Sequence, residues 1–367
     1  MAQDVVRIGI GLVGPGTVGG TLLRQIARQA PAVLSTNKAD LRVLGITSSR
    51  RMVLSDSGIN LHGWTEIFES KSVSADMESF LSHVAGCDGY HHVLVDCTAS
   101  DAVPLHYKDW ILKGGHVVAA NKKLGAGALD VYKGVKESCD KCAATFLYEA
   151  TVGAGMPIIS TLKGMLDTGD QVQRIEGILS GTLSFILNTL SERPGTSFSE
   201  VVSQARKLGF TEPDPREDLS GADVVRKVVV LARDCGLDIS AEDVPVESLV
   251  PKELQAVKSV EEFMEKLPQY DDLMRSRLES ARAANEVLRC VGIVDIEKAS
   301  CAVKVERYPS SHPFAGISGT DNIVQFTTSR YSPRRLVIQG PGAGPEVTAM
   351  GVFSDLLALA HSRGAPL

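Results

Sequence analysis

A glycine-rich turn near the N-terminus constrains the fold of this chain most strongly. The apolar, β-branched run Val5–Val13 predicts a buried strand, and it leads into a G-x-G-x-x-G motif and then a segment with helical spacing. In that context Gly14 permits a tight turn, Gly16 lets the backbone approach a pyrophosphate, and Gly19 lets helix and sheet pack closely. The motif therefore predicts a dinucleotide site at a helix N-terminus. The expected cofactor contacts in this turn are Gly14, Gly16, Thr17, Val18 and Gly19.

Alternation of short β-rich runs with helix-length segments continues to about residue 150 and is typical of βαβ units. The expected strands are Val5–Val13, Arg42–Thr47, Val93–Cys97, His116–Ala120 and Thr145–Tyr148, and the expected helices include Thr17–Ala30 and Pro104–Lys113. We therefore expect an α/β protein with a Rossmann-type doubly wound parallel sheet in residues 1–150. A second α+β catalytic and dimerisation domain is expected in 151–335, and residues 336–367 are expected to return to the nucleotide-binding domain.

Composition narrows the functional classes. The chain of 367 residues is 44% hydrophobic and 22% charged, with a formal net charge of −6, and it contains no long basic block. These values favour a small-molecule substrate over nucleic acid or a membrane surface. No apolar stretch has membrane-spanning length, and the first strand leaves no room for a signal peptide. Seven scattered cysteines favour a reducing compartment, so a cytoplasmic location is expected, with a plastid open if a transit peptide has been removed.

The end of the second predicted strand bears on the choice of cofactor. NAD enzymes usually carry an acidic residue there to hold the ribose hydroxyls. Here Arg42–Thr47 runs into the sequence Ser-Ser-Arg-Arg at residues 48–51, which contains no acid. The pattern favours NADP(H), with NAD(H) as the alternative, and a solvated basic loop is the competing interpretation. Two further strand ends carry Thr98 and Lys122, which are expected near the nicotinamide and the substrate because ligands bind at the carboxyl edge of such sheets.

The segment from Thr211 to Lys227 has the highest density of polar residues. Ser220 is a candidate N-cap, and Asp223 and Lys227 form an i, i+4 pair on the predicted helix that follows. Such a pair near a cleft can position a proton donor, although a surface ion pair is the ordinary interpretation. Additional acids beside the pair favour a ligand with a cationic amino group. These acids are Glu212, Asp214, Glu217 and Asp218.

A glycine-punctuated turn over Glu149–Pro157 has two interpretations. Inward-pointing carbonyls and one carboxylate can hold a hard cation with oxygen ligands. The same turn can serve only as a hinge between domains, and the residues alone favour the hinge.

Several separated motifs together resemble homoserine dehydrogenase over nearly the whole chain. Besides the glycine turn, they are Asn121–Lys122, Glu149–Pro157, Ser180–Thr182, Gly209–Lys227, His312–Gly316 and Gly340–Thr348. The resemblance is to the monofunctional type, without an aspartokinase or a C-terminal regulatory domain. It implies reversible NAD(P)H-dependent reduction of L-aspartate 4-semialdehyde to L-homoserine, in threonine, methionine and isoleucine biosynthesis, by a homodimer.

The resemblance also implies roles for particular residues. Lys227 would exchange the proton at the developing alkoxide, with Lys122 assisting and Asp223 orienting, because hydride delivery to a carbonyl leaves negative charge on oxygen. The implied substrate contacts are Glu212, Asp218 and Thr182. The implied sodium ligands are Glu149, Val152, Ala154 and Met156, and the implied cofactor contacts outside the glycine turn are Thr98, Lys122 and Gly344.

Alternative functions make different demands on the residues. Another small-aldehyde NAD(P) oxidoreductase that works through a thioester needs an activated cysteine, and none of the seven lies in a convincing site. A non-catalytic NADP-binding sensor would keep the glycine turn but would not require Asp223, Lys227 and Lys122 together.

Overall fold

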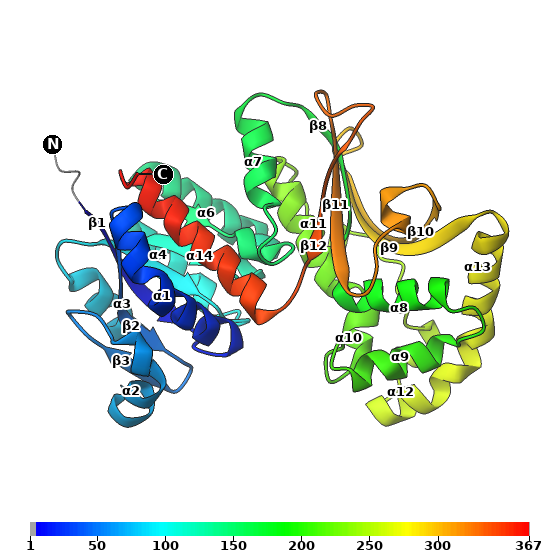
Figure 1. The fold of residues 1–367 in the computed structure, drawn as a ribbon, viewed down its shortest axis with the longest axis horizontal. Coiled ribbons are helices and arrows are strands. Elements are labelled where there is room, and N and C mark those ends of the chain that lie inside the picture. Colours follow the sequence, from blue (N-terminus) through cyan, green and yellow to red (C-terminus); the bar gives the residue numbers. More distant parts are fainter. Residues whose placement is uncertain (1–4, 367) are drawn as a thin grey trace. The chain divides into compact units, whose positions relative to one another are not determined.

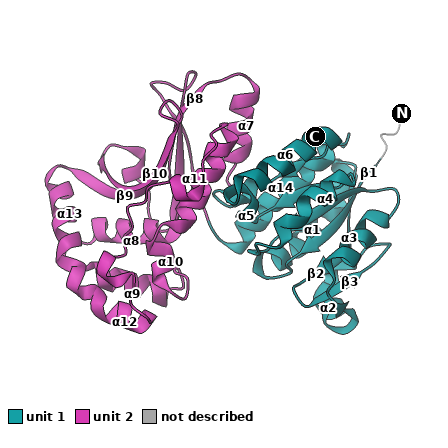
Figure 2. Cartoon of the chain, turned by 180° about the vertical axis from the view of Figure 1, so that it is seen from behind, with its two compact units in different colours: residues 1–155, 343–367 teal, residues 156–342 magenta. Residues whose placement is uncertain are grey.

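The computed structural model describes residues 5–366 and divides the chain into two compact units. The first contains residues 1–155 and 343–367, and the second contains residues 156–342 (Figure 2). The second boundary lies seven residues beyond the expected one, because Leu336–Pro341 pairs with Asp321–Thr328 as the edge strand of the second sheet. Of the predicted C-terminal segment, residues 336–367, only the part from residue 343 onward belongs to the first unit.

A seven-stranded sheet in the order β4-β3-β2-β1-β5-β6-β7 forms the centre of the first unit. The five strands from β2 to β7 are parallel, and β1 lies between β2 and β5, which confirms the predicted doubly wound sheet. Strands β3 and β4 extend it by antiparallel pairing. The strands are β1 (Val6–Val13), β2 (Ala39–Thr47), β3 (Arg51–Leu54), β4 (Val73–Ser74), β5 (His91–Asp96), β6 (His116–Ala119) and β7 (Phe146–Leu147).

Helices from both ends of the chain cover this sheet. The C-terminal helix α14 lies beside α1 (Figure 1), where the Gln25 side-chain amide donates to the Glu346 carbonyl at 3.0 Å. Ile8 and Leu12 of β1, Leu22 of α1 and Leu356 of α14 are all fully buried in one core. The helices are α1 (Thr17–Thr36), α2 (Trp64–Lys71), α3 (Met77–Gly86), α4 (Tyr107–Leu112), α5 (Lys123–Ala126), α6 (Leu129–Cys142) and α14 (Pro345–Ser362).

A neutral histidine is built into this core. His116 begins β6 and is 4% exposed, and its Nδ1 accepts the Thr145 N–H at 3.0 Å. Burial, followed by the charge of Arg363, lowers the pKa of His116 from its ordinary 6.5 to about 4. The folded state therefore binds fewer protons than the unfolded state between these values, so stability falls as pH falls through that window.

We expect acidification from pH 7 to pH 4 to cost up to about 3 kcal/mol at this histidine. The measurement is denaturant unfolding of the parent and of His116→Asn, which keeps an acceptor for Thr145 but cannot titrate. The variant should lose less stability over that range, whereas the exposed His62→Asn should follow the parent. Identical pH dependence in His116→Asn and the parent would contradict the prediction.

The second unit contains a five-stranded antiparallel sheet in the order β10-β9-β8-β11-β12. Helix α11 packs closely on it: a Cβ at Gly292 in β9 would lie 2.5 Å from Val228 Cγ2. The strands are β8 (Val172–Ile178), β9 (Glu286–Asp295), β10 (Ser300–Pro309), β11 (Asp321–Thr328) and β12 (Leu336–Pro341). The helices are α7 (Ile159–Asp167), α8 (Gly181–Glu192), α9 (Phe198–Lys207), α10 (Pro215–Leu219), α11 (Ala222–Asp234), α12 (Val260–Lys266) and α13 (Asp271–Ala283).

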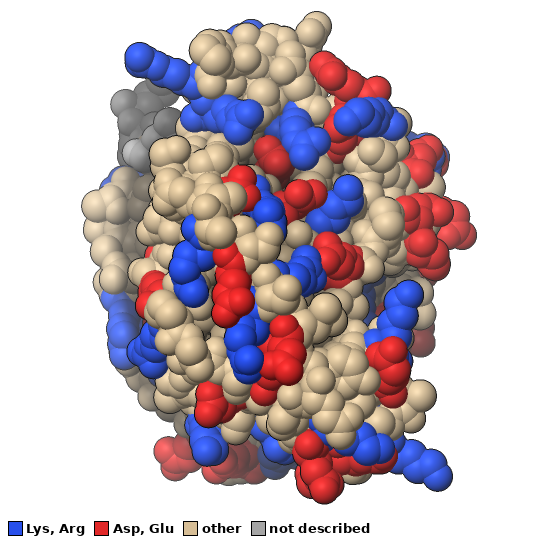
Figure 3. Space-filling model, turned by 90° about the vertical axis from the view of Figure 1, so that its right-hand side faces the viewer, with Lys and Arg blue, Asp and Glu red and all other residues tan. Residues whose placement is uncertain are grey.

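Two further features of the structure are the character of its helices and the distribution of its surface charge. Within residues 5–366, no helix combines the length and the apolar character that crossing a bilayer requires. Figure 3 shows Lys and Arg side chains interspersed with Asp and Glu over the face that it displays.

Candidate functional site

The glycine turn has the geometry that its motif predicts. Gly14 has φ +88°, a conformation that disfavours side chains, and a Cβ at Gly19 would lie only 2.2 Å from the Gly14 carbonyl oxygen. A Cβ at Gly16 would meet no protein atom within 4 Å. Packing among the described residues therefore does not require glycine at position 16. The open space beside Gly16 suits a ligand.

Helix α1 begins at this turn. Its first hydrogen bond runs from the Gly20 N–H to the Gly16 carbonyl at 2.7 Å, so the amides of Thr17, Val18 and Gly19 precede the helical ladder. Such amides favour an anion in front of them. The turn thus fits the pyrophosphate of a dinucleotide.

A buried carboxylate organises the carboxyl edge of the first sheet. Asp96 ends β5 and is fully buried, and its oxygens accept the Tyr107 hydroxyl at 2.7 Å and the Asn121 amide at 2.9 Å. They also accept the Thr98 N–H at 2.7 Å. Burial raises the pKa of Asp96, and these hydrogen bonds oppose that shift. The network joins the loop after β5 to the loop after β6.

Three predicted cofactor or substrate contacts lie in these loops or at a helix start of the same unit. Thr98 follows β5, and Lys122 follows β6 as the N-cap of α5, with its carbonyl accepting the Ala126 N–H at 3.0 Å. Gly344 is the N-cap of α14 and has φ +120°, a backbone conformation that requires glycine. Sequence reasoning selected Thr98 and Lys122 but gave no role to Asp96, which positions their loops. An acid ending an apolar strand was the available signal.

The two arginines that favoured NADP(H), Arg50 and Arg51, lie at the turn between β2 and β3 and differ in their contacts. Ser48 Oγ accepts the N–H groups of Arg50 at 3.3 Å and Arg51 at 3.1 Å, which orders the turn. The Arg51 guanidinium lies 5.5 Å from the centroid of the Phe68 ring. Both arginines are exposed, but Arg51 has a structural partner in Phe68, so Arg50 is the better candidate for a phosphate contact.

In the second unit, Lys227 is a buried cation on α11. Its side chain is 8% exposed, and its Nζ donates to the Leu179 carbonyl at 2.5 Å and pairs with Asp223 Oδ2 at 2.9 Å. Arg226 also approaches Asp223, at 3.4 Å. An ammonium has three N–H donors, and the hydrogen bonds among residues 5–366 use two. The predicted pair is therefore anchored to the end of β8 and is not an ordinary surface ion pair.

The loop before α11 is organised by Asp218. Its carboxylate lies 2.9 Å from the Thr182 hydroxyl and accepts the Glu212 N–H at 2.8 Å. The same hydroxyl lies 2.5 Å from the Phe210 carbonyl. The structure therefore brings the three predicted substrate contacts, Thr182, Glu212 and Asp218, into one hydrogen-bonded group. The Glu212 side chain remains exposed.

Two expectations for this loop need correction. Ser220 is not the N-cap of α11: that position is Gly221, with φ +77°, and Ser220 is the C-cap of α10. Asp214 serves the fold, because it caps α10 and pairs with Arg216 at 2.6 Å. Arg216 in turn donates to the Val257 carbonyl at 2.7 Å.

The predicted cation loop begins in the first unit. Glu149 is 7% exposed, and its N–H donates to Asp355 of α14 at 2.9 Å. Ala154 has φ +55°, an uncommon conformation for a residue other than glycine, and its carbonyl oxygen lies 2.9 Å from the position of a Cβ built on Gly351. Val152 is fully buried. Met156 opens the second unit, where its carbonyl accepts the Ile158 N–H at 2.8 Å.

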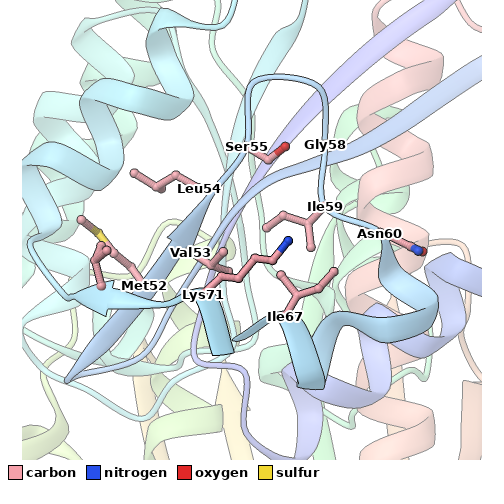
Figure 4. Close-up of a pocket in the computed structure, with 10 residues that line it drawn as sticks. Met52, Val53, Leu54, Ser55, Gly58, Ile59, Asn60, Ile67 and Lys71 are labelled. Atoms are coloured by element: carbon pink, nitrogen blue, oxygen red, sulfur yellow. The ribbon is translucent and has the colours of Figure 1, made fainter. Parts of the chain in front are cut away.

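A separate cavity of about 460 Å³ lies beside β3 and α2. Figure 4 shows the Lys71 side chain extending across it toward Ile59 and Ile67. Its lining contains none of the predicted cofactor, substrate or catalytic residues, so it is distinct from the candidate site.

Fold and site together define a nicotinamide-dinucleotide-binding oxidoreductase. Residues 14–149 match the family model described as "Homoserine dehydrogenase, NAD binding domain", and residues 157–357 match the model described as "Homoserine dehydrogenase". The chain belongs to the homoserine dehydrogenase family of oxidoreductases.

Curated relatives agree with the family models. A homoserine dehydrogenase of Schizosaccharomyces pombe is 39% identical, over 97% of this chain and 96% of that protein. The chloroplastic bifunctional aspartokinase/homoserine dehydrogenase 1 of Arabidopsis thaliana is 52% identical over 98% of this chain, which spans only 39% of that protein's length.

Solved structures share the fold. A Candida auris protein of unknown function has a TM-score of 0.89 at 36% identity, covering 97% of this chain and 98% of that one. A hyperthermophilic archaeal homoserine dehydrogenase in complex with NADPH has a TM-score of 0.73 at 23% identity, covering 99% and 100% of the two chains.

Proposed function

We propose that this chain catalyses reversible NAD(P)H-dependent reduction of L-aspartate 4-semialdehyde to L-homoserine, a step toward threonine, methionine and isoleucine. The observation that carries the proposal is the ion pair of Lys227 and Asp223, in which the buried Lys227 is held on the Leu179 carbonyl, in a unit that matches the homoserine dehydrogenase family model. The bound dinucleotide supplies the hydride. The chain's own residues bind the substrate and manage the proton.

Lys227 is the proposed proton donor to the aldehyde oxygen. Hydride addition leaves negative charge on this oxygen, and a positioned ammonium both neutralises the charge and supplies a proton. Asp223 orients the ammonium, and the Leu179 carbonyl limits its motion. Lys122 is proposed to assist, from the carboxyl edge of the first sheet.

The substrate's amino group is the proposed partner of Glu212 and Asp218, with Thr182 completing the group. Asp218 holds the Glu212 backbone, so the loop is ordered before a ligand arrives. An ordered loop suits binding of a cationic amino group, because the loop then loses less conformational entropy when the ligand binds.

The properties of four cysteines argue against the alternative reaction through a thioester. Burial raises the pKa of Cys235, Cys290 and Cys301 to about 12, and it also raises that of Cys97. A catalytic cysteine requires a lowered pKa.

The assay that tests the proposal is oxidation of NADPH or NADH by aspartate semialdehyde without any acyl acceptor. No consumption of either cofactor would refute the proposal.

NADP(H) is the proposed preferred cofactor, and Arg50 its proposed 2′-phosphate contact. Arg50→Ala should raise KM for NADPH by about tenfold, the value of roughly one charge-assisted hydrogen bond, with little change for NADH. Arg42→Ala, which removes an arginine paired with Asp40, is the control and should change neither KM. An equal rise in both KM values for Arg50→Ala would argue against phosphate recognition.

Two further parts of the proposal rest on the family resemblance, and a third rests on the free thiols. A monovalent cation, sodium, is proposed at Glu149, Val152, Ala154 and Met156; the buried carboxylate and the carbonyl-rich turn are a donor set that suits a hard cation. Homodimer assembly is proposed by the same route. A cytoplasmic location is proposed from the free thiols.

A further inference from the structure

Three side chains of different chemistry gather away from the candidate site, in the first unit. Asp56 follows β3, whereas His83 and Cys87 lie one helical turn apart at the end of α3. One potential ligand atom from each lies within 4.8 Å of the others, beside a cavity of about 340 Å³ that Asp88 also lines. Because α3 ends just before β5 begins, the cluster lies at the amino edge of the sheet, opposite the glycine turn.

The hydrogen bonds of the protein leave His83 unexplained. Its Nδ1 lies 3.7 Å from Asp56 Oδ1, which is too far for a hydrogen bond. Its Nε2 is buried, and no hydrogen-bond partner reaches it among residues 5–366. Nδ1, the nitrogen that lies 3.7 Å from Asp56 Oδ1, likewise makes no hydrogen bond among residues 5–366, so its lone pair can bind an ion without breaking an existing hydrogen bond.

The spacing of the cluster is close to that of a metal site. Zinc binds histidine nitrogen at about 2.0–2.1 Å and thiolate at about 2.3 Å in tetrahedral geometry, which places ligand atoms about 3.3–3.6 Å apart. The separation of 3.7 Å between Asp56 and His83 is almost that value. All three ligand atoms lie within 4.8 Å of one another, and the Asp56 side chain is 91% exposed, so it can change its rotamer to approach an ion.

Local charge also favours a cation. The carboxylates of Asp56 and Asp88 line the same cavity as the Cys87 thiol, so a divalent cation placed there is attracted by both. A bound ion also stabilises the Cys87 thiolate, and the thiol proton passes to solvent.

We propose that Asp56, His83 and Cys87 form a binding site for a borderline-soft divalent cation of the zinc type, with Asp88 or water as the fourth ligand. The mixture of nitrogen, sulfur and oxygen donors suits zinc better than magnesium or calcium. The ion joins the loop after β3 to the end of α3. Its role is to stabilise the amino edge of the sheet, without contact with the candidate dinucleotide turn.

Titration of the purified chain with Co²⁺, a spectroscopic substitute for zinc, tests this site. We expect one equivalent to bind with a thiolate-to-cobalt charge-transfer absorption, and Zn²⁺ to displace it. Cys87→Ser and His83→Ala should lose the absorption, and Asp56→Asn should weaken binding at least about tenfold. Zn²⁺ should raise the unfolding temperature of the parent but not that of Cys87→Ser.

The control variant is Cys142→Ser, which removes a free thiol outside the cluster and should keep the absorption. Circular dichroism and NADPH affinity verify that each variant is folded, and NADPH affinity should not depend on the metal. Absence of the charge-transfer absorption in the parent would overturn the site. Its persistence in Cys87→Ser, or its loss in Cys142→Ser, would do the same.

Discussion

Lys227→Ala is expected to lower kcat about 10²- to 10⁴-fold, the usual contribution of a positioned general acid, while NADPH still binds. The substitution removes the ammonium that pairs with Asp223 and contacts the Leu179 carbonyl. It leaves the dinucleotide turn of the other unit untouched. The measurement is steady-state kinetics with aspartate semialdehyde, together with NADPH affinity from fluorescence.

Lys266→Ala is the matched control. Lys266 pairs with Glu262 at 2.6 Å in the same i, i+4 arrangement on a helix, but its side chain is 44% exposed. It should leave kcat unchanged, because this exposed pair lies outside the proposed catalytic and substrate-binding residues. Lys227→Met, which preserves length and burial, separates loss of the charge from loss of packing. A kcat near the parent's in both Lys227 variants would remove this residue from its proposed role.

Gly19→Ala is expected to lower the stability of the fold, whereas Gly16→Ala is expected to lower the affinity for NADPH. A methyl group at Gly19 would lie 2.2 Å from the Gly14 carbonyl oxygen, so the variant should lose at least about 1–3 kcal/mol of stability, the usual cost of overpacking. A methyl group at Gly16 meets no protein atom within 4 Å. That variant should unfold near the parent's temperature but bind NADPH at least about tenfold more weakly, because the methyl group occupies the space of the pyrophosphate.

Gly63→Ala provides the control for Gly16→Ala. Gly63 is also the N-cap of a helix, α2, and a Cβ there likewise meets nothing within 4 Å. Any general cost of alanine at an N-cap is shared by the two variants, so only Gly16→Ala should weaken NADPH binding. Equal affinities in the two variants would show that the open space at Gly16 has no role in cofactor binding.

Local patterns were sufficient for much of the fold. Apolar runs and their spacing predicted the parallel strands and α11, and helix geometry alone placed Asp223 beside Lys227. The same local patterns also misplaced the end of one helix and the start of another. Helix α1 continues six residues past the predicted end at Ala30 and contains Pro31, because Val33 in the following turn is buried in the core. The start of α11 was misplaced because the left-handed conformation of Gly221 depends on the turn before it.

The sequence by itself determined the dinucleotide-binding turn, the individual strands of the first sheet and the i, i+4 spacing of Asp223 and Lys227, because each depends on neighbours within a few residues. Only the tertiary structure decided what surrounds them. Leu179 lies 48 positions from the lysine that it anchors, and Asn121 lies 25 positions from Asp96. Contacts of this kind form when strands and helices pack side by side, and no local periodicity specifies which distant carbonyl or carboxylate will be the partner.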